Sequence, residues 1–125
     1  KNIKERNSLA KMRLTALFID SLRLYKNATI ACGLVTQEMF NKTGAFRSDA
    51  EYLCNLARSL STVELSILYI EEKNGKYKVS LRSKDIVDVS KIAVKFLGGG
   101  HKRSAGFETD ETDLYSLTKK IIKES

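Results

Sequence analysis

The stretch KVSLRSKDIVDVSKIAVKFLGGGHKRSAGF, residues 78–107, decides the fold. It begins with alternating apolar residues, Val79 and Leu81, which are typical of a strand with one buried face. Asp88 then has the position of an N-cap for a helix over residues 89–96. Three glycines end this helix, because glycine adopts left-handed conformations at little cost, and a short strand follows at residues 104–108. This order of strand, helix, glycine run and strand predicts an α/β fold.

Two further strand regions lie upstream of this stretch. Apolar residues alternate over residues 63–69 and 77–81, and Asn74-Gly75 between them suits a tight two-residue turn, so we expect a β-hairpin. The run TIACGLV at residues 29–35 is short, apolar and rich in branched side chains. It predicts a buried strand.

Apolar residues at helical spacing predict four helices beside the one that Asp88 begins. These helices are expected over residues 14–26, 36–42, 50–60 and 111–123. Thr36 can cap the second of them, and Ser48 with Glu51 has the spacing of a capping box before the third.

Together these segments predict one α/β domain with a mixed β-sheet of about four or five strands flanked by helices. A length of 125 residues is usual for a single domain. The chain begins with a charged stretch that is typical of a linker. We therefore expect residues 1–27 to form a linker helix that follows an earlier domain, and residues 28–125 to form the folded domain.

Composition narrows the class of partner. A net charge of +7 favours anionic partners, which include nucleic acids, nucleotides and lipid surfaces. No stretch approaches the roughly 20 apolar residues of a membrane span, and the first residues contain no apolar core of a secretory signal. We expect a cytoplasmic protein without a membrane partner. Cys32 and Cys54 match no metal motif and are expected to be buried free thiols.

The glycine run and the basic residues after it are the main candidate site. The residues concerned are Gly98, Gly99, Gly100, His101, Lys102 and Arg103. Successive glycine N–H groups can converge on an anion, and the three side chains that follow add donors, so a phosphate fits this stretch. The alternative is a flexible connection with a solvated basic tip. The run is neither a Walker loop nor a dinucleotide-binding fingerprint, because both require a different spacing.

The end of the strand before the helix is the second candidate site. Alternation places Lys78, Ser80 and Arg82 on the polar face of that strand. Arg82, Ser83 and Lys84 could then form an anion-binding strand end. The alternative is a solvated sheet edge that binds no particular ligand.

The sequence offers little for metal binding or for catalysis. His101 is the sole histidine, and no HxxxH, DxD or paired CxxC spacing occurs. General acid catalysis needs a positioned partner for the histidine, and the pattern provides none. We expect no metal site and no catalytic residue in this chain.

Read together, residues 78–107 resemble the DHH-associated domain of the DHH phosphoesterase superfamily, and most closely its bifunctional oligoribonuclease and pAp phosphatase branch, the nanoRNases. The family has a strand that ends in Arg-Ser, an Asp-Val helix start, and a GGGGH run followed by a small-small-Gly step. All three features occur here in that order. Two positions depart from the pattern, because Leu97 replaces the first glycine and Ser104 replaces an alanine.

The resemblance implies the substrate-binding domain of an enzyme that hydrolyses short oligoribonucleotides, pAp or linear dinucleotides. It places the glycines and His101 against substrate phosphate, and Arg82 against phosphate or base across the cleft. Ser83, Lys102 and Arg103 are assigned supporting roles, and Asn55 is a further candidate. Mn²⁺ or Mg²⁺ belongs to a preceding DHH domain that this chain lacks, so the chain alone is expected to be inactive and to hold no cofactor.

Two other functions stay open. The same associated domain occurs at the end of alanyl-tRNA synthetases, which implies a non-catalytic RNA-binding or assembly module. The third reading is a regulatory or dimerising domain whose glycines only turn the chain, and it predicts no phosphate affinity. A homodimer is possible under each reading.

Overall fold

The computed structural model describes residues 8–125 and confirms the α/β class. Its elements are α1 (Leu9–Ser21), β1 (Arg23–Tyr25), β2 (Ile30–Val35), α2 (Gln37–Thr43), the 3-10 helix η2 (Arg47–Ala50), α3 (Leu53–Arg58), β3 (Leu65–Glu71), β4 (Tyr77–Ser83), α4 (Val89–Lys95), β5 (Gly99–His101), β6 (Ser104–Thr109) and α5 (Leu114–Glu124).

All strands belong to one mixed sheet in the order β1-β2-β3-β4-β6-β5. β2 and β3 run parallel, and the other neighbouring pairs are antiparallel. The sheet has 6 strands, more than the sequence predicted. The two additional strands, β1 and β5, have 3 residues each, which is too short for alternation to reveal.

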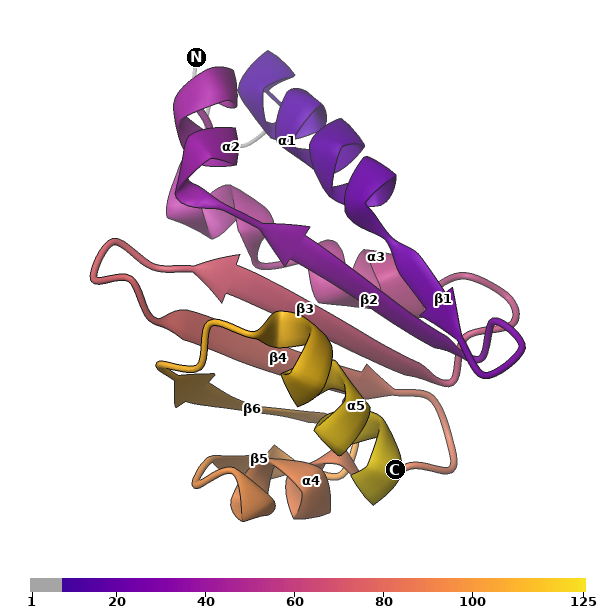
Figure 1. The fold of residues 1–125 in the computed structure, drawn as a ribbon. Helices are drawn as coiled ribbons and strands as arrows, with labels where there is room; N and C mark the ends of the chain where they lie inside the picture. Colours follow the sequence, from indigo (N-terminus) through magenta and orange to yellow (C-terminus); the bar gives the residue numbers. More distant parts are fainter. Residues whose placement is uncertain (1–7) are drawn as a thin grey trace.

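Helices cover the two faces of the sheet unequally. α4 and α5 pack against one face, where they contact core residues such as Leu81 and Phe107. α1, α2 and α3 pack against the other face over β2, β3 and part of β4, where Leu68 and Ile70 lie in the core. Figure 1 shows α5 in front of the sheet and α3 behind it. β6 and β5 are thus largely uncovered on the α1–α3 face.

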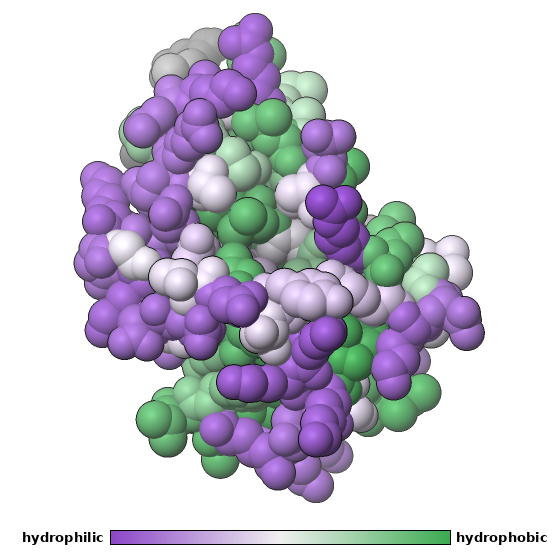
Figure 2. All heavy atoms as spheres, in the orientation of Figure 1, coloured by the Kyte–Doolittle hydropathy of each residue, from purple (hydrophilic) through white to green (hydrophobic). Residues whose placement is uncertain are grey.

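The surface of the α5 face is mainly hydrophilic (Figure 2). Apolar patches lie among the hydrophilic residues in this view. Cys32 and Leu34 line a groove of about 310 Å³ beside α5. Beneath this groove the Tyr69 hydroxyl and the Thr118 hydroxyl are hydrogen-bonded at 2.7 Å. Within residues 8–125, no helix has the length and apolar character needed to cross a membrane.

The first helix ends earlier than its apolar periodicity predicted. α1 stops at Ser21, and Tyr25 lies in β1, although it was expected in the helix. Tyr25 still packs against the core, so its apolar spacing reflects a partly buried strand residue and not a helix face. A tight left-handed turn then joins β1 to β2, with φ of 53°, 55° and 65° at Lys26, Asn27 and Ala28.

The capping box predicted at Ser48 and Glu51 does not form. The Asp49 carboxylate instead accepts a hydrogen bond from the Phe46 backbone N–H at 2.8 Å, and residues 47–50 make a short 3-10 helix. Glu51 is paired with Arg47 at 2.8 Å. The helix expected over residues 50–60 is therefore reduced to α3, which begins at Leu53.

The hairpin between β3 and β4 is confirmed, but its connection is longer than predicted. The Glu72 backbone N–H donates to Lys76 O at 2.8 Å, so the loop has Asn74 at its centre and Gly75 in a left-handed conformation with φ of 88°. This is the common hairpin loop in which glycine supplies the left-handed residue before the bulge.

Several local predictions are confirmed. The Thr36 hydroxyl caps α2 by accepting from the Met39 N–H at 3.2 Å, and the Asp88 carboxylate caps α4 by accepting from the Ser90 N–H at 3.0 Å. The strand predicted at residues 104–108 is β6. Cys32 and Cys54 are buried and free.

Candidate functional site

Three neighbouring strands form a floor whose own residues have small side chains or none. The sheet register places Gly99 of β5 beside Gly106 of β6, and Gly106 beside Ser80 of β4. Ser80 in turn pairs with Leu68, which packs beneath α1–α3. The floor therefore lies on the same face of the sheet as α1–α3, in the part of that face that these helices do not cover. We call the surface made by Gly99, Gly106 and Ser80 the glycine shelf.

The glycines of this region serve different purposes. A Cβ on Gly106 would lie 2.6 Å from Val79 O, and a Cβ on Gly98 would lie 2.5 Å from Phe107 Cβ, so the packing of β6 demands glycine at both positions. A Cβ on Gly99 would meet nothing within 4 Å. Gly99 is therefore the place where the shelf is open to solvent.

A row of polar residues borders the shelf at one end. Ser104 of β6 pairs with Arg82 of β4 on one side and with His101 of β5 on the other, so the three lie on the same face. Arg82 and His101 are two strands apart, or roughly 10 Å between their backbones. Within residues 8–125 Arg82 makes no ion pair, and His101 is exposed. Lys78, likewise without an ion pair, borders the other end of the shelf opposite Glu108.

Ser83 and Arg103 lie on the opposite face of the sheet from Arg82. Ser83 pairs with Leu65, whose side chain belongs to the core beneath α4 and α5. The Arg103 Nη1 donates to Ser83 Oγ at 3.1 Å and to Val87 O at 2.6 Å. Ser83 and Arg103, both predicted as site residues, are therefore separated from the shelf by the sheet. Their hydrogen bond connects the end of β4 to the turn between β5 and β6.

Gly98, Gly100 and Lys102 were expected to lie in one loop. They belong instead to the end of α4 and to the hairpin that β5 and β6 form. The Gly98 N–H donates to Ala93 O at 2.8 Å and closes α4. Gly100 has a φ of 146° and pairs with Ala105. Lys102 is exposed in the two-residue turn between β5 and β6, where its carbonyl accepts from the Val89 N–H at 2.9 Å.

A family model, the DHHA1 domain, matches residues 31–124. This chain belongs to the DHHA1 family. The match confirms the resemblance seen in residues 78–107. One curated relative of this DHHA1 domain is the probable bifunctional oligoribonuclease and PAP phosphatase NrnA of Streptococcus mutans, which is 24% identical over 115 residues and is matched by 89% of this chain.

Several proteins of known structure have a similar fold. An exopolyphosphatase-related protein from Bacteroides fragilis is 25% identical, with a TM-score of 0.83 over 98% of this chain and 35% of its own. The pGpG-specific phosphodiesterase PggH of Vibrio cholerae has a TM-score of 0.63 at 13% identity, over 92% of this chain and 38% of its own. The C-Ala domain of Aquifex aeolicus alanyl-tRNA synthetase has a TM-score of 0.59 at 13% identity, over 82% of this chain and 95% of its own. The last two likenesses concern the fold alone.

The DHHA1 domain described here is about a third of the length of its enzyme relatives. It spans 36% of the Streptococcus mutans protein and 35% of the Bacteroides fragilis protein. Among residues 8–125, no group of three His, Cys, Asp or Glu side chains is arranged to hold a metal ion. Burial raises the pKa of Cys32 and that of Cys54 to about 11, so both thiols are protonated at neutral pH.

Three residues at or near the site were not assigned to it from the sequence. Gly106 is a glycine inside a strand, which commonly marks a close approach of another group and could have served as a signal. Ser80 was placed on the polar face by alternation, but only the register shows that it adjoins Gly106. Arg58 of α3, which donates to Ser83 O at 3.1 Å, reaches the end of β4 by tertiary packing that no local pattern predicts.

The end of α4 in this DHHA1 domain differs from the sequence prediction, because Leu97 and not a glycine adopts the left-handed conformation, with φ of 68°. Its side chain is 96% exposed and loses no packing on truncation. A Leu97→Gly variant is expected to raise the free energy of unfolding by about 0.5–1 kcal/mol, since glycine tolerates this conformation. Urea denaturation measures the change. Val94→Gly, in the exposed last turn of α4, is the matched control and should lower stability by about 0.5 kcal/mol; a destabilised Leu97→Gly would contradict the prediction.

Glu64 fixes the loop between β4 and α4. Its carboxylate accepts from the N–H groups of Ile86 and Val87 at 2.8 and 2.9 Å. Burial raises the pKa of Glu64, but these backbone hydrogen bonds and the nearby Arg103 charge outweigh it and hold the pKa below its usual value. The carboxylate therefore contributes stability above the unfolded-state pKa near 4.3, and this contribution is lost as the pH falls through the lower folded-state pKa.

A Glu64→Gln variant is expected to lower the free energy of unfolding by about 1 kcal/mol at pH 7, after allowance for solvent screening. The difference from the wild type should shrink below about pH 4, where the wild-type carboxylate is protonated too. Denaturation curves between these pH values test this. Glu108→Gln is the control, because Glu108 is exposed and makes no side-chain hydrogen bond within residues 8–125. An equal loss at both pH values would contradict the role of charge.

Proposed function

We propose that this DHHA1 domain binds the phosphate groups of short oligoribonucleotides, pAp or linear dinucleotides for a metal-dependent phosphoesterase. The observation that supports this most directly is the open floor at Gly99, bordered by the cation Arg82 and by His101. The relatives named above include a probable oligoribonuclease and PAP phosphatase, which agrees with a ligand of this class.

The chemistry of the shelf suits a phosphate group. A guanidinium such as that of Arg82 can donate two parallel hydrogen bonds to phosphate oxygens. A ligand can approach the main chain at Gly99 because no side chain intervenes. β5 is an edge strand, so alternate backbone N–H groups along it have no strand partner and are free to donate to an anion.

The hydrolytic step is assigned to a preceding DHH domain of the full-length enzyme. Mn²⁺ or Mg²⁺ bound there would activate water for attack on phosphorus. The residues of this chain hold the substrate phosphate and fix its position relative to that site, which lowers the entropic part of the barrier. The chain alone is accordingly expected to bind ligand without cleaving it.

A titration of this chain by NMR at low salt, with pAp and with an RNA dinucleotide, tests the proposal. We expect weak binding with shifts at residues 80–82, 99–101 and 106, and a loss of affinity of about tenfold or more in Arg82→Ala and His101→Ala. Lys120→Ala is the matched control, because it removes one exposed charge from α5 on the opposite face. It should change affinity little.

Binding that is indifferent to Arg82→Ala and His101→Ala, or no binding at all, would contradict the proposal. That result would favour an RNA-contacting or assembly module, the role considered for the alanyl-tRNA synthetase domain of the same fold. Equal losses in all three variants would indicate long-range charge attraction without a defined site.

A further inference from the structure

The outer face of α1 carries a row of apolar side chains that the described part of the chain leaves open. Leu9, Met12 and Ile19 are 61%, 58% and 52% exposed, and Ala16 between them is exposed too. Single apolar side chains are common on protein surfaces, whereas a contiguous apolar patch commonly marks an interaction site. We call Leu9, Met12, Ala16 and Ile19 the α1 stripe.

The spacing of the stripe is typical of a helix that packs against a second helix. Its members follow one another at intervals of three, four and three residues, which is the seven-residue repeat that keeps side chains on one side of a helix. Leu14 and Phe18, on the other side of α1, are fully buried in the core. A surface helix needs one apolar side to pack on its own domain, and α1 has two.

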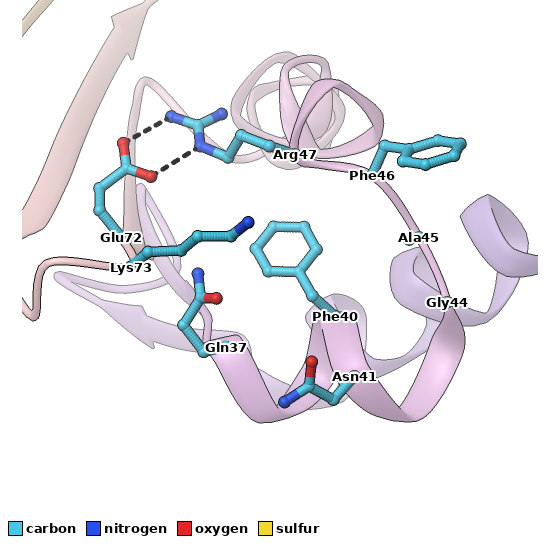
Figure 3. A pocket seen from close by; sticks show the side chains of 9 residues that line it. All are labelled: Gln37, Phe40, Asn41, Gly44, Ala45, Phe46, Arg47, Glu72 and Lys73. Carbon is cyan, nitrogen blue, oxygen red and sulfur yellow. Dashed lines mark hydrogen bonds and ion pairs between the residues drawn. The ribbon is translucent and has the colours of Figure 1, made fainter.

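The stripe lies on the outside of the molecule. Figure 1 shows α1 along the outer edge, next to β1 and β2. The stripe residues line neither the hollow of about 580 Å³ between α2, η2 and the loop after β3, whose side chains Figure 3 shows, nor the groove beside α5. Small molecules bind in concave sites. A protruding helix face of this kind instead suits the face of another helix.

Two charged residues beside the stripe identify the second helix. Arg13 and Asp20 are seven residues apart, so they lie on the same flank of the stripe. Both are exposed, and neither makes an ion pair within residues 8–125. In an antiparallel pair of α1 helices related by a two-fold axis, Arg13 of each copy faces Asp20 of the other, which gives two equivalent ion pairs. A parallel pair would place them beside Ser8 and Thr15, which carry no charge.

A contact between two α1 helices leaves the glycine shelf open. β1 and β5 are the opposite edges of the sheet. α1 packs over β2, next to the β1 edge, whereas the shelf lies at the β5 edge. Association through α1 and ligand binding on the shelf can therefore be tested independently of each other.

We propose that this chain forms a two-fold homodimer in which the α1 stripes of two copies pack antiparallel, with Arg13 of each copy paired with Asp20 of the other. Ala16, at the middle of the stripe, allows the two helices to approach closely. A helix of 13 residues is roughly 20 Å long, which is short for a stable interface. We therefore expect a weak dimer, with a Kd on the order of 10–100 μM.

Sedimentation velocity of this chain over a range of concentrations measures the association. Ala16→Glu is expected to raise the Kd by about tenfold or more, because the two-fold axis brings two carboxylates together in an apolar contact. Ala16 is exposed, so the substitution should leave the fold intact. Val94→Glu is the matched control, since Val94 is 61% exposed and lies on α4, on the other face of the sheet. It should dimerise as the wild type does.

Exchange of the two charges tests the antiparallel arrangement. Arg13→Asp alone places like charges opposite each other at both ends of the contact, and so does Asp20→Arg alone. Each is expected to raise the Kd by about tenfold. The double variant Arg13→Asp/Asp20→Arg restores both ion pairs with the signs reversed, and its Kd should return to that of the wild type.

Three results would overturn the proposal. A chain that stays monomeric at about tenfold above the expected Kd would leave the stripe as a contact for another domain or protein. Association that Ala16→Glu does not weaken would show that the copies meet elsewhere. Single charge variants that weaken the dimer, together with a double variant that does not recover it, would contradict the antiparallel pairing of Arg13 with Asp20.

Discussion

A Gly98→Ala variant is expected to lose about 3 kcal/mol of folding free energy or more. The added Cβ would lie 2.5 Å from Phe107 Cβ and 2.8 Å from Phe107 Cα, so it would push against backbone that cannot rotate away. Overpacking of a core by a movable side chain typically costs about 1–3 kcal/mol, and a clash with backbone exceeds that range. Since domains of this size are stable by roughly 5–15 kcal/mol, the melting temperature should fall clearly in a thermal scan.

Gly99→Ala is the matched control for this effect. It makes the same chemical change at the next residue, where a Cβ meets nothing within 4 Å. Its melting temperature should stay close to that of the wild type. Equal stability of the Gly98 and Gly99 variants would mean that β6 does not approach the helix end as closely as the structure has it.

The fold was largely predictable because its main elements carry strong local patterns. β4 alternates in hydrophobicity, so its buried residues Val79 and Leu81 could be assigned to one face from the sequence, whereas β3 is buried on both faces. The caps at Thr36 and Asp88 depend on side chains within three residues, and both were predicted. Local contacts of this kind can be predicted because both partners lie close together in the sequence.

The errors arose where tertiary contacts outweigh local preference. Tyr25 continues the apolar spacing of α1 but packs from a strand, which its spacing alone cannot distinguish. Leu97 adopts a left-handed conformation that glycine would favour, because the Gly98 N–H bond to Ala93 O fixes the helix end there. The three glycines that directly follow Leu97 had been expected to adopt this conformation.

The candidate site was predictable in its residue types and only partly in its geometry. Alternation correctly placed Arg82 on the polar face of its strand, but the position of Gly99 beside Gly106 depends on the register of β5, which has no pattern of its own. Ser83 follows Arg82 directly, and a strand turns successive side chains to opposite faces. Neighbours in the sequence therefore lie on opposite sides of the sheet, and Arg103 lies with Ser83.

Gly99→Val should fold normally and lose ligand affinity, which makes it the sharpest test of the glycine shelf. Valine suits an extended edge strand, and open space surrounds the position, so we expect an unchanged melting temperature. Its side chain would occupy the floor where the proposed phosphate lies beside Arg82. Loss of the charge-assisted hydrogen bonds formed there, each contributing about 1.5–3 kcal/mol, predicts weaker binding of pAp by roughly tenfold to a hundredfold.

Titration of pAp into the wild type, Gly99→Ala and Gly99→Val measures this effect, and the smaller alanine should give an intermediate loss. A graded loss of affinity at constant stability has no explanation in folding, because a Cβ at this position meets nothing within 4 Å. Wild-type affinity in Gly99→Val would place the phosphate elsewhere on the domain. Packing of the fold thus requires glycine at position 98, whereas only a bound ligand would require glycine at position 99.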